Sequence, residues 1–277
     1  MPGPARERLA EMARQAGTEL PLAEGALLIA AEEYPSLDAA RYLALLDALA
    51  QEVRGLVSPG GDSATRIRGL CEGLFKNLGF RGNAEEYDDP RNSFLNDVLD
   101  RRLGIPISLA VVTLEVGWRL RLPLYGVGMP GHFLVGCEAP GEPLYVDAFH
   151  GTMLTASGCE HLFRRMMAGG HSFREEYLTP TPARYILVRM LRNLKGIYLQ
   201  REDLDRAAAA IERILLLAPD LGGDVRDLGL IHYRQGMLVE ARELLERYLR
   251  SAPGDAADRR TTEGYLAQIR GLLGRLN

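Results

Sequence analysis

The chain has 277 residues, 47% of them hydrophobic and 25% charged, so it can bury a sizeable core and lacks the composition of a disordered protein. Its 33 basic and 37 acidic residues are interspersed and give a formal net charge of −4, which argues against a protein built to hold a nucleic-acid backbone. The charged N-terminus and the absence of any apolar run near 20 residues predict neither a signal peptide nor a membrane span.

Helices are predicted for the first hundred residues. Between residues 22 and 57, apolar residues recur at spacings of three and four, which indicates two amphipathic helices. Tyr34-Pro35-Ser36 separates them, and Ser36 is the expected N-cap of the second helix. A third helix is expected over residues 67–78, closed by Gly79, because glycine tolerates the positive φ found at helix ends.

Residues 106–120 form the most apolar of the predicted helices. Apolar side chains occupy nearly every side of it, which is typical of a helix buried in the middle of a domain. Pro106 suits its first turn, where the backbone needs no donor. This helix is therefore the expected centre of the core.

Short strands are predicted after this helix. Residues 124–127 form one candidate, and residues 132–137 and 144–149 form a hairpin around the turn-rich loop 138–143. We therefore expect an α+β fold that is predominantly helical, with a small antiparallel sheet.

The C-terminal part repeats itself at an offset of 34 residues, the period of a tetratricopeptide repeat. A final helix over residues 264–276 is expected to cap the stack. The matched positions are Leu194 and Leu228, Ala207 and Ala241, Ile211 and Leu245, and Pro219 and Pro253.

Three regions are expected from these elements. Gly169-Gly170 and Thr179-Pro180-Thr181-Pro182 mark the boundary between core and tail. We predict an N-terminal helical region over residues 1–80, a core over residues 81–182 and a helical tail with its capping helix over residues 183–277.

His132 and Asp147 are the candidate chemical residues of the hairpin. Counted outward from the loop, they lie close to opposite each other, and side-chain alternation puts both on one face. A carboxylate that hydrogen-bonds an imidazole fixes the histidine tautomer, as general-base catalysis requires. If the hairpin packs on the N-terminus of the buried helix, the pair faces the positive end of the helix dipole.

Three segments resemble the SirB-type family of transglutaminase-like proteins, which joins such a core to C-terminal tetratricopeptide repeats. They are NSFLNDVLDRRLGIPISL at residues 92–109, GVGMPGHFLV at 126–135 and YVD at 145–147, within a resemblance over roughly residues 22–255. The resemblance implies a papain-like core in which a nucleophile begins the central helix and His and Asp lie on two antiparallel strands.

Carried over by position, His132 and Asp147 match the family's catalytic-type histidine and aspartate, but the nucleophile does not match. Family members with a cysteine carry it as Gly-x-Cys at the start of this helix, and here Gly104-Ile105-Pro106 puts proline in that place. The nearest hydroxyl, that of Ser108, lies two residues further on and points about 200° away around the helix.

Metal and redox sites have no support in the sequence. Cys71, Cys137 and Cys159 are widely spaced and odd in number, which favours reduced thiols in a cytoplasmic protein. The chain has no CxxC, HxH or HExxH pattern, so we expect no metal and no cofactor. We likewise expect no nucleic-acid and no membrane partner.

Two functions of different classes follow. In the first, the core is a pseudoenzyme, and the tail binds a protein or peptide partner through a surface around Tyr198, His232 and Tyr233. In the second, Ser108, His132 and Asp147 form the triad of a cysteine-less hydrolase or acyltransferase on amide or peptide bonds. We favour the first, because a serine without a precisely placed base is a far poorer nucleophile than a thiolate.

Overall fold

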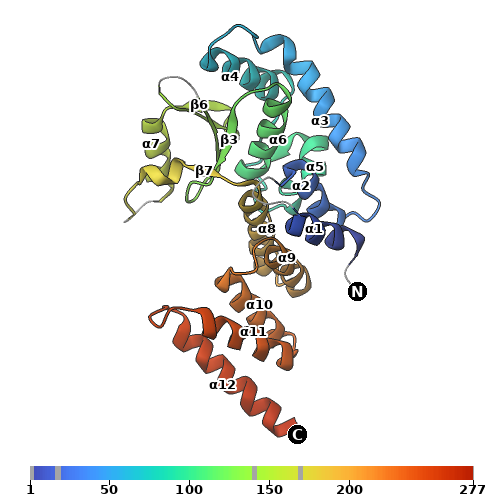
Figure 1. Cartoon of the computed structure of the whole chain (residues 1–277), viewed down its shortest axis with the longest axis vertical. Coiled ribbons are helices and arrows are strands. Elements are labelled where there is room, and N and C mark those ends of the chain that lie inside the picture. Colours follow the sequence, from blue (N-terminus) through green and yellow to red (C-terminus); the bar gives the residue numbers. More distant parts are fainter. Residues whose placement is uncertain (1–2, 16–19, 139–141, 168–170, 277) are drawn as a thin grey trace. The chain divides into compact units, whose positions relative to one another are not determined.

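The computed structural model describes residues 3–15, 20–138, 142–167 and 171–276. The chain divides into two compact units, residues 1–190 and residues 191–277, which are described separately below (Figure 1). The predicted class is confirmed, because helices predominate and the first unit holds a small antiparallel sheet. No helix among the described residues is long and apolar enough to cross a membrane.

The first unit begins with a group of helices: α1 (Pro4–Gln15), α2 (Leu22–Ala31), α3 (Ala39–Val53), α4 (Ser63–Cys71) and α5 (Leu95–Arg101). The predicted pair corresponds to α2 and α3, but the cap differs. Asp38 rather than Ser36 caps α3, since its carboxylate accepts the backbone N–H of Arg41 at 3.1 Å. The third predicted helix is α4 with a π-helical extension, Glu72–Asn77, and Gly79 follows it with a φ of 74°.

A sheet in the order β6-β5-β4-β3-β7 follows, with all four strand pairs antiparallel. Its strands are β3 (Leu124–Val127), β4 (Leu134–Cys137), β5 (Leu144–Asp147), β6 (Thr152–Leu154) and β7 (Pro180–Thr181). The predicted β4–β5 hairpin forms, with Val135 opposite Val146, but both strands are shorter than expected and His132 precedes β4. Residues 139–141 of its loop lie outside the described part.

Helix α6 (Pro106–Arg119) is the centre of this unit, as predicted. Its residues from Pro106 to Gly117 are all buried, and it contacts helices α2, α3 and α5 as well as strands β3 and β4 (Figure 1). A two-residue parallel pair, β1 (Arg81–Gly82) with β2 (Leu103–Gly104), leads into its first turn.

The segment expected to link core and tail has a structural role of its own. Pro180–Thr181 forms β7 and pairs with Gly126 and Val127 of β3 at the sheet edge, where proline is tolerated. Helix α7 (Ala156–Met166) packs on β5 and β6. Helix α8 (Ala183–Gln200) follows β7 and contains the border between the two units. Gly169-Gly170, the other predicted linker, lies outside the described residues.

The second unit has the helix pairs that the repeat predicts. Its elements after α8 are α9 (Leu204–Leu217), α10 (Gly222–Arg234), α11 (Leu238–Ser251) and α12 (Arg259–Leu276). Ala207 and Ala241, equivalent in the two copies, are fully buried. At Gly229 a Cβ would lie 2.7 Å from the Leu245 side chain, so a larger residue would force that side chain to shift where α10 and α11 meet. The last helix begins at Arg259, five residues before the predicted Gly264.

A buried carboxylate ties the start of the tail to α10. Asp224 is 2% exposed and accepts from Arg192 at 2.6 Å and from Lys195 Nζ at 2.8 Å. Burial alone would raise the pKa of Asp224, but the hydrogen bonds from Arg192 and Lys195 outweigh it and hold the pKa below its ordinary value.

We expect the tail to lose stability in acid through this group. Because its folded-state pKa lies below the unfolded value of about 3.9, the stabilisation is complete above about pH 4 and is lost as the pH falls through the folded-state value. Urea unfolding of wild type and Asp224→Asn, followed by circular dichroism at several pH values, measures the free energy of unfolding that this group contributes. The stability gap between the two should shrink from pH 6 to about pH 3. A constant gap would contradict this assignment.

Candidate functional site

His132 lies in the turn that leads from β3 into β4. Gly131 before it has a φ of 77°, a left-handed conformation that glycine adopts without cost, and the His132 N–H donates to the Met129 carbonyl at 3.1 Å. Arg189 of α8 donates to the carbonyls of Met129 at 2.9 Å and His132 at 2.6 Å. The turn is thus held at both ends, and the imidazole is 3% exposed.

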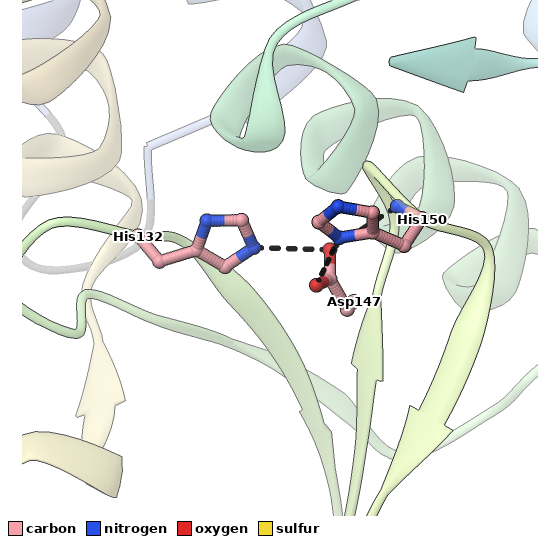
Figure 2. Close-up of side chains that lie close together, drawn as sticks. All are labelled: His132, Asp147 and His150. Carbon is pink, nitrogen blue, oxygen red and sulfur yellow. Dashed lines mark hydrogen bonds and ion pairs between the residues drawn. The ribbon is translucent and has the colours of Figure 1, made fainter. Parts of the chain in front are cut away.

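Asp147, the last residue of β5, points at this imidazole (Figure 2). His132 Nε2 lies 3.0 Å from Asp147 Oδ1, and both side chains are 3% exposed. The contact lies outside strict hydrogen-bond geometry, and within the described chain Nδ1, the other ring nitrogen of His132, has no hydrogen-bond partner. The structure therefore brings the two predicted residues together as a close polar contact.

A second histidine, His150, completes the cluster and was not predicted. Its Nδ1 lies 2.8 Å from Asp147 Oδ2, and its ring stacks near that of His132 with centroids 6.3 Å apart (Figure 2). Asp147 Oδ1 also accepts the backbone N–H groups of Phe149 at 3.0 Å and His150 at 3.3 Å. The sequence held a signal for this contact in the three-residue spacing from Asp147 to His150. An aspartate side chain commonly accepts hydrogen bonds from the backbone of the turn that follows it, which brings the third residue close to the carboxylate.

The two imidazoles keep the Asp147 carboxylate charged. Burial alone would raise the pKa of Asp147, but its contact with His132 and then that with His150 outweigh this effect and lower the pKa. A buried carboxylate between two imidazoles can orient a base, relay a proton or ligate a cation.

The Ser108 hydroxyl has hydrogen-bond partners outside this cluster. Its hydroxyl donates to the Asn92 carbonyl at 2.6 Å and accepts the Ile105 N–H at 3.1 Å, the backward half of a capping box at the start of α6. The residue is fully buried. These bonds give the serine a role in fixing the helix start and leave no hydrogen bond between it and His132 among those of the described residues.

Ser108→Ala is accordingly expected to destabilise the core by about 1–3 kcal/mol, because it leaves the buried Ile105 N–H without its acceptor. Urea unfolding followed by the fluorescence of Trp118, the only tryptophan of the chain, reports this loss. Thr113→Val on the same helix is the matched control. Its buried hydroxyl donates only to the Leu109 carbonyl, so its loss should be smaller. Equal losses would contradict the capping role.

The cysteines do not replace the missing nucleophile, because all three are buried. Pro106 begins α6, as the proline in the cysteine position predicts. The three cysteines are buried and unpaired, and burial raises the pKa of Cys71 and of Cys159 to about 12. Burial also raises the pKa of Cys137. All three are protonated thiols near neutral pH, and a thiol is a weak nucleophile.

Sequence comparisons agree with this architecture. A profile of the transglutaminase-like superfamily matches residues 40–192, and a tetratricopeptide-repeat profile matches residues 194–267. The chain belongs to the SirB-type family of transglutaminase-like proteins.

Relatives of this SirB-type protein include bacterial and animal proteins. It is 42% identical to a UPF0162 protein of Xylella fastidiosa over 238 residues, 84% of this chain and 85% of that one. It is 31% identical to a UPF0162 protein of Pseudomonas aeruginosa over 201 residues, 72% of each chain. Human F-box only protein 21 is 35% identical over 143 residues, 48% of this chain and 22% of that protein. No solved structure matches.

The tail of this SirB-type protein contains a groove, and only one of the three predicted partner-binding residues lines it. Tyr233 does, together with Leu230, Arg234 and Tyr265. Tyr198 is 5% exposed beneath the Arg206 guanidinium and does not line the groove. His232 is partly buried and does not line the groove. The burial of Tyr198 follows from helix pairing, because paired helices bury aromatic residues between them.

Proposed function

We propose that this SirB-type protein is a non-catalytic interaction module of the cytoplasm, whose tetratricopeptide tail binds a segment of a partner protein. The observation that carries the proposal is the composition of the core site. Proline replaces the nucleophile at the start of α6, and the Ser108 hydroxyl is engaged with Asn92 and Ile105. His132 and Asp147 thus keep a base-like arrangement with no group to activate in the described chain.

The tail supplies a surface of the right kind. Its groove has a volume of about 420 Å³. The rings of Tyr233 and Tyr265 meet edge to face in it at 5.6 Å, and Leu230 adds apolar surface. Arg234, whose side chain is 52% exposed, also lines the groove and can pair with an acidic group of a ligand, whereas Asp227 lines it but is already paired with Lys195 and Arg226. Rigid aromatic side chains next to a few charged groups are typical of sites that bind a short peptide segment.

The cytoplasmic part of the proposal rests on thiol chemistry. Cys71, Cys137 and Cys159 are all reduced and buried, with no disulfide among them. Free buried thiols are the usual state of cysteines in a reducing compartment.

Affinity capture with the full chain tests the binding role. The wild type, two groove variants, Tyr265→Ala and Arg234→Glu, and a control outside the groove, Arg250→Glu, are immobilised in parallel. A protein recovered by wild type and control is purified, and its dissociation constant is measured for each variant.

The proposal expects at least a tenfold weaker dissociation constant for Tyr265→Ala, since a buried interface tyrosine commonly contributes about 2 kcal/mol or more. Arg250→Glu should bind like wild type. Equal affinity across all variants would exclude the groove as the binding surface.

A further inference from the structure

We propose that His132, Asp147 and His150 form a binding site for a divalent transition-metal ion of the Zn²⁺ type. This inference is independent of the proposed partner binding. It departs from the expectation drawn from the sequence, where no metal-ligand pattern is visible. The ligands come from a turn, a strand end and a second turn, so folding rather than local spacing brings them together.

The geometry of the three side chains fits one ion. One donor atom from each residue lies within 4.8 Å of the other two. The individual separations are 3.0 Å from His132 Nε2 to Asp147 Oδ1 and 2.8 Å from His150 Nδ1 to Asp147 Oδ2. Ligands about 2.1 Å from a tetrahedral Zn²⁺ are about 3.4 Å apart, so small side-chain movements would seat the ion.

The buried histidine gives an independent reason to expect a ligand. His132 is 3% exposed, and its Nε2 faces Asp147 Oδ1 at 3.0 Å in a contact outside strict hydrogen-bond geometry. A buried imidazole nitrogen needs a partner, because an unpaired buried polar atom costs about 1–3 kcal/mol. A nitrogen and a carboxylate oxygen at this separation can share a proton or ligate one cation. A metal ion at that point would satisfy the nitrogen lone pair.

The Asp147 carboxylate is held in an orientation that suits a metal ligand. Asp147 is oriented by the backbone N–H groups of Phe149 and His150, the kind of outer contact that holds metal ligands in place. Its negative charge stands between two imidazoles, and a set of two nitrogens and one oxygen suits Zn²⁺ and its first-row neighbours better than Ca²⁺ or Mg²⁺.

The site opens onto a cavity, so water or a small ligand can complete the coordination shell of the ion. Asp147 and His150 line a cavity of about 320 Å³, which His161 and Arg165 of α7 also line. The half-exposed His150 gives an ion a route in from solvent. Three protein ligands with an open position are the arrangement of zinc sites that bind water or a small ligand.

Zinc binding to the untagged, full-length protein tests the inference. After metal is removed with a chelator, Zn²⁺ is titrated in competition with a chromophoric chelator, and thermal stability is measured with and without Zn²⁺. Wild type, His150→Ala and Asp147→Asn are compared with His161→Ala. The His161 control removes a histidine of the same cavity that is outside the cluster.

We expect one Zn²⁺ per wild-type chain, a rise in melting temperature on binding, and the same behaviour in His161→Ala. His150→Ala should bind at least about tenfold more weakly, and its half-exposed position means that the variant should still fold. Wild-type binding weaker than about 1 mM would overturn the inference. So would affinity that is unchanged in both His150→Ala and Asp147→Asn.

Discussion

Asp224→Ala is expected to lower the free energy of unfolding of the tail by about 3 kcal/mol. The substitution leaves Lys195, which is 12% exposed, with Asp227 as its remaining carboxylate partner, while Arg192 can turn to solvent because its side chain is 49% exposed. Breaking one side of a buried ion pair costs about 3–5 kcal/mol, and the freedom of Arg192 places this case at the lower end.

Hydrogen exchange of the full chain localises the effect. Amides of α9, α10 and α11 should lose protection in Asp224→Ala, while those of α6 should keep theirs. Arg192→Met is the matched control, since Asp224 then keeps Lys195 and the loss should be less than half as large. Equal losses in the two variants would show that Asp224 is not the centre of the network.

Phe133→Ala is expected to destabilise the core by about 3–5 kcal/mol and to disturb the histidine cluster. Phe133 is 1% exposed, immediately follows His132 and carries the Arg189 guanidinium over its ring, 5.4 Å from the centroid. Arg189 in turn donates to the carbonyls of Met129 and His132. Loss of the ring therefore leaves a cavity and removes the support of the turn that positions His132.

Urea unfolding followed by Trp118 fluorescence measures this loss, and Phe133→Leu serves as control because it keeps most of the buried volume. The leucine variant should lose clearly less stability than the alanine variant. If both behave like wild type, Phe133 does not support the turn.

Much of the fold was predictable because its signals are local. The apolar faces of residues 106–120 identified α6, and the 34-residue offset identified the helix pairs of the tail. Strand alternation placed His132 and Asp147 on one side of the hairpin, and the structure puts them 3.0 Å apart. These features follow from periods that a single sequence displays directly: two residues for a strand, about 3.6 for a helix and 34 for the repeat.

The rest depends on contacts between distant segments. The Ser108 hydroxyl reaches the carbonyl of Asn92, sixteen residues earlier, and no pattern near Ser108 announces that bond. His150 was assigned no role because histidine ligands were sought at fixed spacings rather than around the aspartate. Pro180–Thr181 has the composition of a linker, and only the free edge of β3 makes it a strand.

In the described chain Ser108 and His132 share no hydrogen bond, and this decides whether the core can form an acyl-enzyme. A serine becomes a nucleophile when a base accepts its proton, and here the hydroxyl proton is directed at the Asn92 carbonyl. The His–Asp pair of the transglutaminase-like core is then free for another purpose, for which the metal site is our proposal.

Covalent labelling tests this claim most directly. The full chain, Ser108→Ala and His132→Ala are incubated with a fluorophosphonate probe and analysed by intact-protein mass spectrometry. A serine hydrolase of known activity confirms that the probe is reactive, and circular dichroism confirms that each variant is folded. We predict no adduct on any of the three proteins. An adduct on Ser108 of the wild type that is lost in both variants would contradict the account.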